Sequence, residues 1–165
     1  MLATAVLTVA LLSQVPNPWD AAKKVAGDAA TKGIEGEINK RLLAEGQKNQ
    51  CSFKTDSDVL DGNCDKKLKN LANALIDAKK KLNDAGVKNF KFEVSGHTDS
   101  SGKADHNKEL SQKRAATIVK ELVARGVPPE EIIAVGMGSE RMLVKPDDTP
   151  AKKAKNRRYE LQVRL

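Results

Sequence analysis

The chain has 165 residues, of which 39% are hydrophobic but only 3% aromatic, and its formal net charge at pH 7 is +7. This length suits one domain with accessory segments, and its core has to be built from aliphatic side chains. The positive charge favours a polyanionic partner without choosing one. A single Trp19 and a single Tyr159 argue against the clustered aromatic surface that stacks on bases. We therefore expect no nucleic-acid partner.

An apolar run at residues 1–12 is too short to cross a bilayer. Its length is that of a signal-peptide core, although no Lys or Arg precedes it, as a truncated leader would explain. We interpret residues 1–15 as a signal-peptide remnant and expect export. A buried or frayed N-terminal helix is the alternative.

Residues 16–49 predict an amphipathic helical linker. Small apolar residues recur at helical spacing between Trp19 and Gln47, with lysines on the other face. The narrow apolar stripe of this 19–47 helix favours a spacer, or a helix that docks on an envelope protein partner. Peripheral association with the outer membrane is the alternative.

The folded domain is expected over residues 50–165. Its hydrophobic patterns predict strands at 51–54, 87–94, 133–137 and 157–165, main helices at 65–85 and 105–125, a turn-rich loop at 55–63, and a polar loop with a brief helix at 141–155. Four short strands and two main amphipathic helices in this order predict a two-layer α/β sandwich.

The two cysteines of the sequence, Cys51 and Cys64, enclose a polar loop. No second Cys pair or His pair accompanies them, so a zinc site is not expected. In an oxidising compartment we expect them to form a disulfide. Two buried free thiols are the alternative.

Residues 96–114, which read GHTDSSGKADHNKELSQKR, join a strand to a helix through a polar loop. Asp99 in the loop and Arg114 on the third turn of the helix can face each other across this corner. A carboxylate accepts hydrogen bonds from an ammonium, and a guanidinium donates a planar pair to a carboxylate. The two side chains therefore suit a ligand that carries both groups. The alternative is a structural ion pair between loop and helix.

Signals for catalysis and for metal binding are weak. His97 and Asp99 lack a third metal ligand, and neither a G-x-S-x-G motif nor a phosphate loop occurs. His97 is better interpreted as a hydrogen-bonding loop residue than as a general base. We expect a binding protein without enzymatic activity or cofactor. Because neighbouring strand side chains point to opposite faces, at most one of Arg157 and Arg158 should reach the ligand pocket.

The pattern G-H-T-D-x-x-G-x-x-x-x-N-x-x-L-S-x-x-R-A, from Gly96 to Ala115, resembles the signature of the OmpA-like C-terminal domain family. Residues 156–158 match that family's closing N-R-R. The opening segment is also similar, through Phe53, Asp56, Ser57 and Leu60, although Lys54 replaces the usual Asp. Residues 141–143 depart from the family pattern.

The resemblance implies non-covalent binding of peptidoglycan through the diaminopimelate of its stem peptide, which would tether the cell envelope to the wall. By motif position, Asp99 corresponds to the residue that holds the ligand's ammonium, and Arg114 to the one that holds its carboxylate. Supporting contacts fall to Asn107, Thr98 and Arg158, and Asp56 lines the rim. The resemblance also implies a periplasmic protein associated with the outer membrane.

A second hypothesis is a cationic domain of the periplasm that binds polyanions or proteins. Its candidate residues are Lys152, Lys153, Lys155, Arg157 and Arg158. Binding of this kind should weaken steeply as the salt concentration rises.

Overall fold

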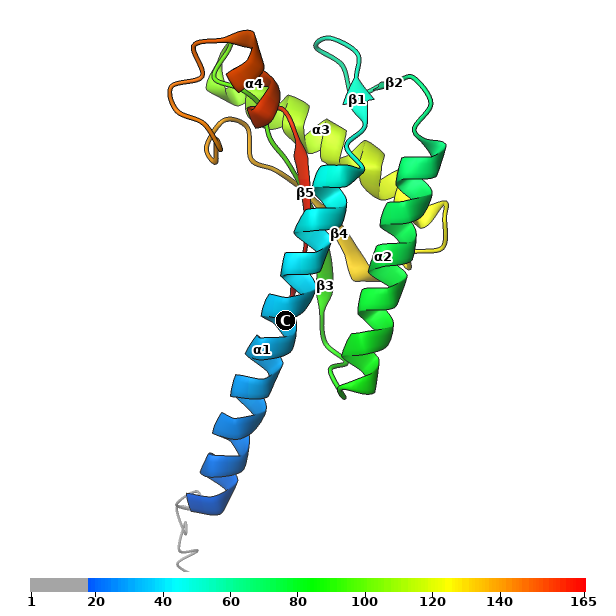
Figure 1. Cartoon of the computed structure of the whole chain (residues 1–165), viewed down its shortest axis with the longest axis vertical. Coiled ribbons are helices and arrows are strands. Elements are labelled where there is room, and N and C mark those ends of the chain that lie inside the picture. The colour runs from blue at the N-terminus through cyan, green and yellow to red at the C-terminus, as the bar shows by residue number, and fades with distance from the viewer. Residues whose placement is uncertain (1–17) are drawn as a thin grey trace, which may run out of the picture.

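The computed structural model describes residues 18–165, so the predicted signal-peptide remnant at 1–15 lies outside the described residues. Figure 1 shows the elements in chain order. They are α1 (Pro18–Lys48), β1 (Ser52–Phe53), β2 (Leu60–Asp61), α2 (Asp65–Asp84), β3 (Lys91–Gly96), α3 (Ala104–Val123), a 3₁₀ turn (Pro129–Glu131), β4 (Ile132–Gly136), α4 (Pro150–Asn156) and β5 (Tyr159–Arg164).

The main sheet has three strands in the order β4-β3-β5. The central strand β3 is parallel to β4 and antiparallel to β5, so that Val94 lies opposite Ala134 and Leu161. Strands β1 and β2 pair with each other as a short antiparallel hairpin. The predicted two-layer α/β fold is confirmed. The described residues contain one strand more than predicted, because β2 lies in the stretch predicted as a turn-rich loop.

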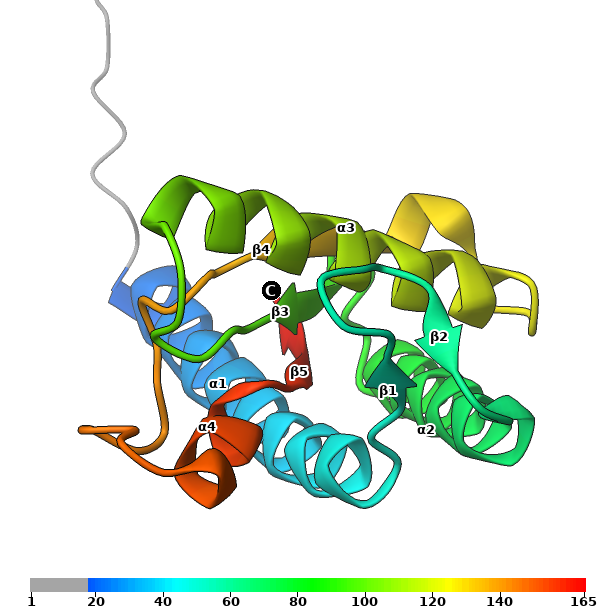
Figure 2. The same ribbon diagram turned by 90° about the horizontal axis from the view of Figure 1, so that it is seen from above.

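The helices form the second layer. In Figure 2, α3 lies beside β4 and β3, α1 lies beside β5, and α2 contacts both α1 and α3. Alternate residues of the strands point toward the helices, and Phe92, Val94, Leu161 and Val163 are at most 1% exposed. They meet buried helix residues at the three- and four-residue spacing of an amphipathic helix, namely Leu68, Leu71, Leu75, Leu82, Ile118 and Leu122.

On β3 and β5 the opposite face of the sheet is polar, whereas β4 places Ile133 and Val135 there. Glu93 on β3 accepts hydrogen bonds from its cross-strand neighbour Gln162 at 2.6 Å and from Arg164 at 3.4 Å. The alternation of apolar and polar residues along β3 and β5 therefore separates an apolar face from a polar one.

The second half of α1, predicted to be a linker, packs against the domain. Ile38 and Leu42 are buried in the core. The side-chain amide of Asn39 bonds both backbone groups of Val163, at 2.6 and 3.1 Å. Gln50, just after the helix, does the same for Tyr159, at 3.2 and 2.7 Å.

These amides cover the outer edge of β5, whose backbone groups would otherwise be open to pairing with another chain. The first half of α1 extends beyond the sheet (Figure 1). Among the helices of residues 18–165, none is long and apolar enough to cross a membrane.

Candidate functional site

Two glycines let α3 lie directly on the ends of β3 and β4. A Cβ at Gly96 would overlap the carbonyl oxygen of Ser111, and one at Gly136 would lie 2.6 Å from the carbonyl oxygen of Lys108. Ser111 Oγ also accepts a hydrogen bond from the amide of Gly138 at 2.8 Å. Because no side chain fits in these contacts, the glycines hold the helix that carries Arg114 against the strand that leads to Asp99.

The loop after β3 is tied down by Asn107 on the first turns of α3. Its Nδ2 donates to the carbonyl oxygens of Ser101 at 2.8 Å and Asp99 at 3.4 Å. The Asp99 carboxylate in turn accepts from the amide of Ser101 at 2.9 Å. Gly102 supplies the left-handed turn of the loop, with a φ of 86°. Asn107 therefore ties the loop to α3.

Asp99 is paired with a cation inside the site. Its Oδ2 accepts a hydrogen bond from the Arg157 guanidinium at 2.7 Å, and its side chain is 11% exposed. Burial would raise the pKa of the Asp99 carboxyl, but the hydrogen bonds from Arg157 and Ser101 outweigh burial and lower that pKa below its ordinary value. Asp99 is therefore ionised at neutral pH.

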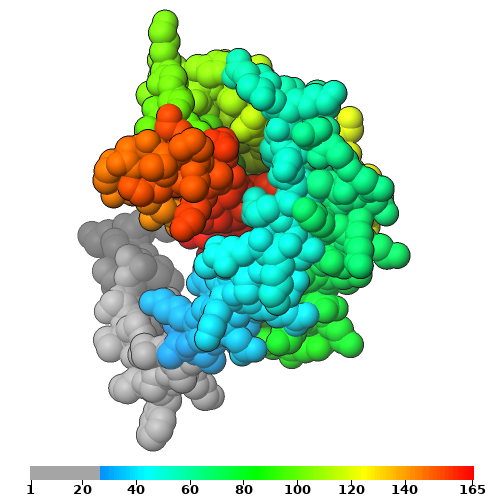
Figure 3. Space-filling view, turned by 45° about the horizontal axis from the view of Figure 1, so that its top comes forward, coloured from blue at the N-terminus to red at the C-terminus, as the bar shows by residue number. Residues whose placement is uncertain are grey.

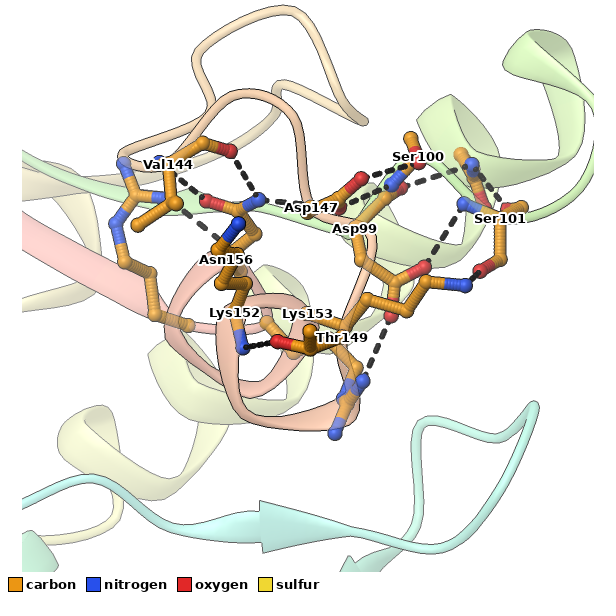
Figure 4. Close-up of polar contacts among 12 residues, drawn as sticks. Asp99, Ser100, Ser101, Val144, Asp147, Thr149, Lys152, Lys153 and Asn156 are labelled. Carbon is orange, nitrogen blue, oxygen red and sulfur yellow. Dashed lines mark hydrogen bonds and ion pairs between the residues drawn. The ribbon is translucent and has the colours of Figure 1, made fainter.

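A buried amide network holds the segment that presents Arg157 (Figure 4). Asn156, fully buried, accepts hydrogen bonds from the amides of Leu143 and Val144 and donates to Asp147 at 3.1 Å. Asp147 accepts from both the hydroxyl and the amide of Ser100, and these two bonds lower its pKa to about 2. The network fixes α4 and its preceding loop to the residue next to Asp99.

Arg114 is held by neutral groups. Its Nε donates to the carbonyl oxygen of Ser57 at 2.9 Å and its Nη2 to that of Lys54 at 3.3 Å. The guanidinium carbon lies 5.1 Å from the centre of the Phe53 ring. Burial lowers the pKa of Arg114, an effect opposed by Asp56 nearby. An arginine stays protonated at neutral pH, so the site keeps this positive charge.

Asp99 and Arg114 line one cavity of about 950 Å³. The other predicted site residues line it too, namely Thr98, Asn107, Arg158 and Asp56. In the space-filling view of Figure 3, the cyan β1–β2 hairpin lies on one side of this face of the molecule, and the orange and red segments around α4 lie on the other. Within residues 18–165 the two charges bond other partners and not each other, which speaks against the alternative of a structural ion pair between them.

The prediction that at most one of Arg157 and Arg158 reaches the pocket is wrong, because both line the cavity. Strand β5 begins only at Tyr159, so the alternation of strand side chains does not apply to the two arginines. Arg158 donates to Glu160 at 2.7 Å and to the carbonyl oxygen of Arg141 at 3.0 Å. These two hydrogen bonds hold Arg158 at the wall of the cavity, whereas Arg157 bonds Asp99.

The basic residues of the second hypothesis do not form a free cationic surface. Lys152 pairs with Asp148 at 2.6 Å, and Lys153 donates to the Ser101 hydroxyl at 2.8 Å. Arg157 and Arg158 are engaged as described above. Four of the five charges therefore already have partners within the domain, and a polyanion would have to displace them.

His97 is buried beside the cavity. Its Nε2 lies 3.2 Å from Ser95 Oγ and 3.7 Å from Glu160 Oε2. Burial, followed by the charge of Arg158, lowers the pKa of His97 to about 4, so its ring is neutral at pH 7. This environment fits the predicted hydrogen-bonding role. Among residues 18–165, no group of three or more His, Cys, Asp or Glu side chains could hold a metal ion.

The predicted disulfide between Cys51 and Cys64 is present. It closes the segment that carries β1, β2 and the carbonyl groups bonded to Arg114. The hydroxyl of Tyr159 accepts from the amide of Cys51 at 3.0 Å and donates to the carbonyl oxygen of Asn49 at 2.6 Å. Burial raises the pKa of this hydroxyl to about 12, so it remains a donor across the physiological range.

A family model described as the OmpA family matches residues 52–157. Outer membrane porin F of Pseudomonas fluorescens is 48% identical over 71 residues, which cover 43% of this chain and 22% of that protein. The peptidoglycan-binding protein ArfA of Mycobacterium tuberculosis is 38% identical over 93 residues, covering 56% and 27%. The matches thus span about a quarter of the length of these curated relatives.

Solved structures show the same fold. The peptidoglycan-associated lipoprotein from Burkholderia pseudomallei superposes with a TM-score of 0.57 at 26% identity, covering 72% of this chain and 92% of that chain. The C-terminal domain of Helicobacter pylori MotB superposes with a TM-score of 0.56 at 23% identity, covering 70% and 83%. At that identity the second match supports the fold alone.

Proposed function

Because the chain belongs to the OmpA family, we propose that it binds peptidoglycan non-covalently through the diaminopimelate of the stem peptide. Asp99 takes the ammonium of this residue and Arg114 its carboxylate. The observation that carries the proposal is that both side chains line one cavity while neither neutralises the other. Relatives whose names include peptidoglycan support the choice of polymer.

The cavity offers a ligand more than the two charges. Thr98 lines the cavity, and its buried hydroxyl has no hydrogen-bond partner among the described residues. Asn107 and Arg158 shape the site through the loops that they hold, and Asp56 lies at the rim. The proposal includes a periplasmic location at the outer membrane, where the chain would tether the envelope to the wall.

Co-sedimentation with diaminopimelate-type sacculi tests this function. Arg114→Ala and Asp99→Ala should each abolish sedimentation of the full chain with the wall while circular dichroism shows an unchanged fold. The matched controls are Arg41→Ala and Asp77→Ala, because these residues form a surface ion pair of the same charge types at 3.0 Å. Undiminished binding by both site variants would overturn the proposal.

The ligand's carboxylate can be tested separately. A stem tetrapeptide with lysine in place of diaminopimelate keeps the side-chain ammonium but lacks the adjacent carboxylate. A charge-assisted hydrogen bond contributes about 1.5–3 kcal/mol, so we expect the lysine peptide to bind at least about tenfold more weakly. Equal affinity for the two peptides would rule out diaminopimelate specificity through Arg114.

The polyanion hypothesis makes a different prediction. Affinity would then follow the salt concentration steeply and nucleic acid would compete with sacculi. We expect neither, because most of the basic residues involved are already paired.

A further inference from the structure

We propose that the segment from Cys51 to Cys64, and Phe53 in particular, positions the Arg114 guanidinium for the ligand's carboxylate. This role rests on the proposed function and assigns a task to residues outside the predicted ligand contacts. Phe53 and the two cysteines are positioning residues, since they act through Arg114.

The contacts of the Arg114 side chain leave part of its guanidinium available. A guanidinium has five N–H donors in a rigid fork. The segment accepts from Nε and Nη2, and the Phe53 ring lies close to the guanidinium carbon. Within residues 18–165, Nη1 has no hydrogen-bond partner. The segment thus orients the group without using all of its donors.

The segment has little support of its own. Strands β1 and β2 share only two residue pairs, Ser52 with Asp61 and Phe53 with Leu60. At the turn, Asp56 adopts a left-handed conformation with a φ of 50°, which a non-glycine residue rarely adopts. A two-stranded hairpin of this size is not stable by itself in water.

The segment is restrained at its ends, at its turn and by Phe53 and Leu60, which pack against the core. The disulfide joins its two ends, and Cys51 and Cys64 are both buried. Asp56 also contacts His106 at the start of α3 at 2.6 Å, but both side chains are more than half exposed, and pairs of this kind contribute little. The disulfide and the packing of Phe53 therefore restrain the carbonyl groups that hold Arg114 more than this exposed pair does.

Holding Arg114 in place should raise affinity. A free arginine side chain loses much conformational freedom when it is fixed by a ligand, and a side chain that is already fixed does not. Loosening the segment should weaken binding of the diaminopimelate tetrapeptide. The lysine tetrapeptide has no carboxylate for Arg114 in this position, so its affinity should change little.

Phe53 provides the sharpest test, with the disulfide intact. Phe53→Leu keeps an apolar side chain but removes the aromatic face, whereas Phe53→Tyr keeps both. We expect Phe53→Leu to weaken the diaminopimelate peptide about fivefold, equal to about 1 kcal/mol, with a change below about twofold for the lysine peptide. Phe53→Tyr should bind both peptides as the unmodified chain does. Equal losses for both peptides, or no loss, would overturn the proposal.

The disulfide is tested by the double variant Cys51→Ser/Cys64→Ser. We expect about a tenfold loss for the diaminopimelate peptide. The Arg114 Nε–H signal in ¹⁵N NMR should also move toward those of exposed arginines. An unmoved signal with unchanged affinity would overturn the role of the bridge. If this variant does not fold, the Phe53 pair decides.

Two outcomes separate the positioning role of the segment from the binding of diaminopimelate. If the unmodified chain does not bind the diaminopimelate peptide, the proposed function fails and this inference falls with it. If the unmodified chain binds and Arg114→Ala does not, while Phe53→Leu and the double cysteine variant both bind normally, only the positioning role is refuted.

Discussion

The two charged sides of the cavity are built in different ways. Asp99 pairs with another charge, Arg157, at 2.7 Å and is backed by the buried network of Asn156. Arg114 is held by two backbone carbonyl groups and an aromatic ring. The anion is therefore compensated within the site, while the cation is only oriented.

This difference has a consequence for binding. A ligand's ammonium meets a carboxylate that already has a cationic partner, so the net gain from the new contact is reduced. A ligand's carboxylate meets a guanidinium with neutral partners and gains the full charge-assisted hydrogen bonds. We therefore expect the carboxylate end to contribute more to affinity than the ammonium end.

The largest expected effect is the loss of stability when the network behind Asp99 is disrupted. Asn156→Ala removes a buried amide and leaves the amides of Leu143 and Val144 and the Asp147 carboxylate without this partner. The bond to Asp147 is buried and the two from the amides are partly buried. An unsatisfied buried group costs about 1–3 kcal/mol and a partly buried one less, so the free energy of unfolding should fall by about 3 kcal/mol. Urea denaturation measures this. A loss below about 1 kcal/mol would show that the network does not hold this side.

His97, two residues before Asp99, should make the stability of the domain depend on pH. Between its ordinary pKa of 6.5 and the folded value of about 4, His97 is protonated in the unfolded chain but not in the folded one. The unfolded chain then binds more protons, so the free energy of unfolding falls as the pH drops through this window, by up to about 3 kcal/mol. His97→Gln should lack this loss. The same pH slope in both proteins would contradict the assignment.

Two variants that each remove one charge test whether the ligand's carboxylate contributes more to affinity than its ammonium. Arg114→Gln should weaken the diaminopimelate tetrapeptide about 100-fold, because about 3 kcal/mol of charge-assisted bonding is lost. Asp99→Asn should weaken it less, since Arg157 already occupies part of the carboxylate. Calorimetric titration measures both values. A larger loss for Asp99→Asn would reverse the comparison.

The smallest expected effect is a shift in the pH at which peptide binding is lost when Arg157 is replaced. Its hydrogen bond helps to keep the pKa of Asp99 low, and Asp99 must be ionised to hold an ammonium. Peptide binding should therefore be lost as the pH falls through this lowered pKa. In Arg157→Gln the Asp99 pKa should rise, so binding should be lost at a higher pH than in the unmodified chain. Identical acid limits would show that Arg157 does not tune Asp99.

Much of the fold could be predicted from local patterns. The helix predicted at 65–85 is observed as Asp65–Asp84, because leucines at helical spacing and a following glycine define it. Strand β3 spans Lys91–Gly96 and not the predicted 87–94. It begins four residues later than predicted, and it ends two residues later because the polar Ser95 interrupts the apolar pattern. Strand β2 has only two residues, too few for any periodicity to show.

The site was predictable only where a motif spans it. Asp99 and Arg114 belong to one continuous pattern, and the structure brings them to one cavity. Asn156 and Arg157 lie in the matched N-R-R, but their bonds to Asp147 and Asp99 depend on how the chain returns after α4. Such contacts between distant residues leave no local pattern. The same holds for the Arg114 bonds to the β1–β2 segment.

An NMR titration of the ¹⁵N-labelled chain with the diaminopimelate tetrapeptide tests most directly whether Asp99 and Arg114 bind the ligand together. The Ser101 amide bonds the Asp99 carboxylate, and Arg114 carries the Nε–H that bonds the Ser57 carbonyl. We expect both signals to shift together and to saturate with a single Kd. Saturable shifts elsewhere on the surface, with these two signals unmoved, would contradict the proposed site.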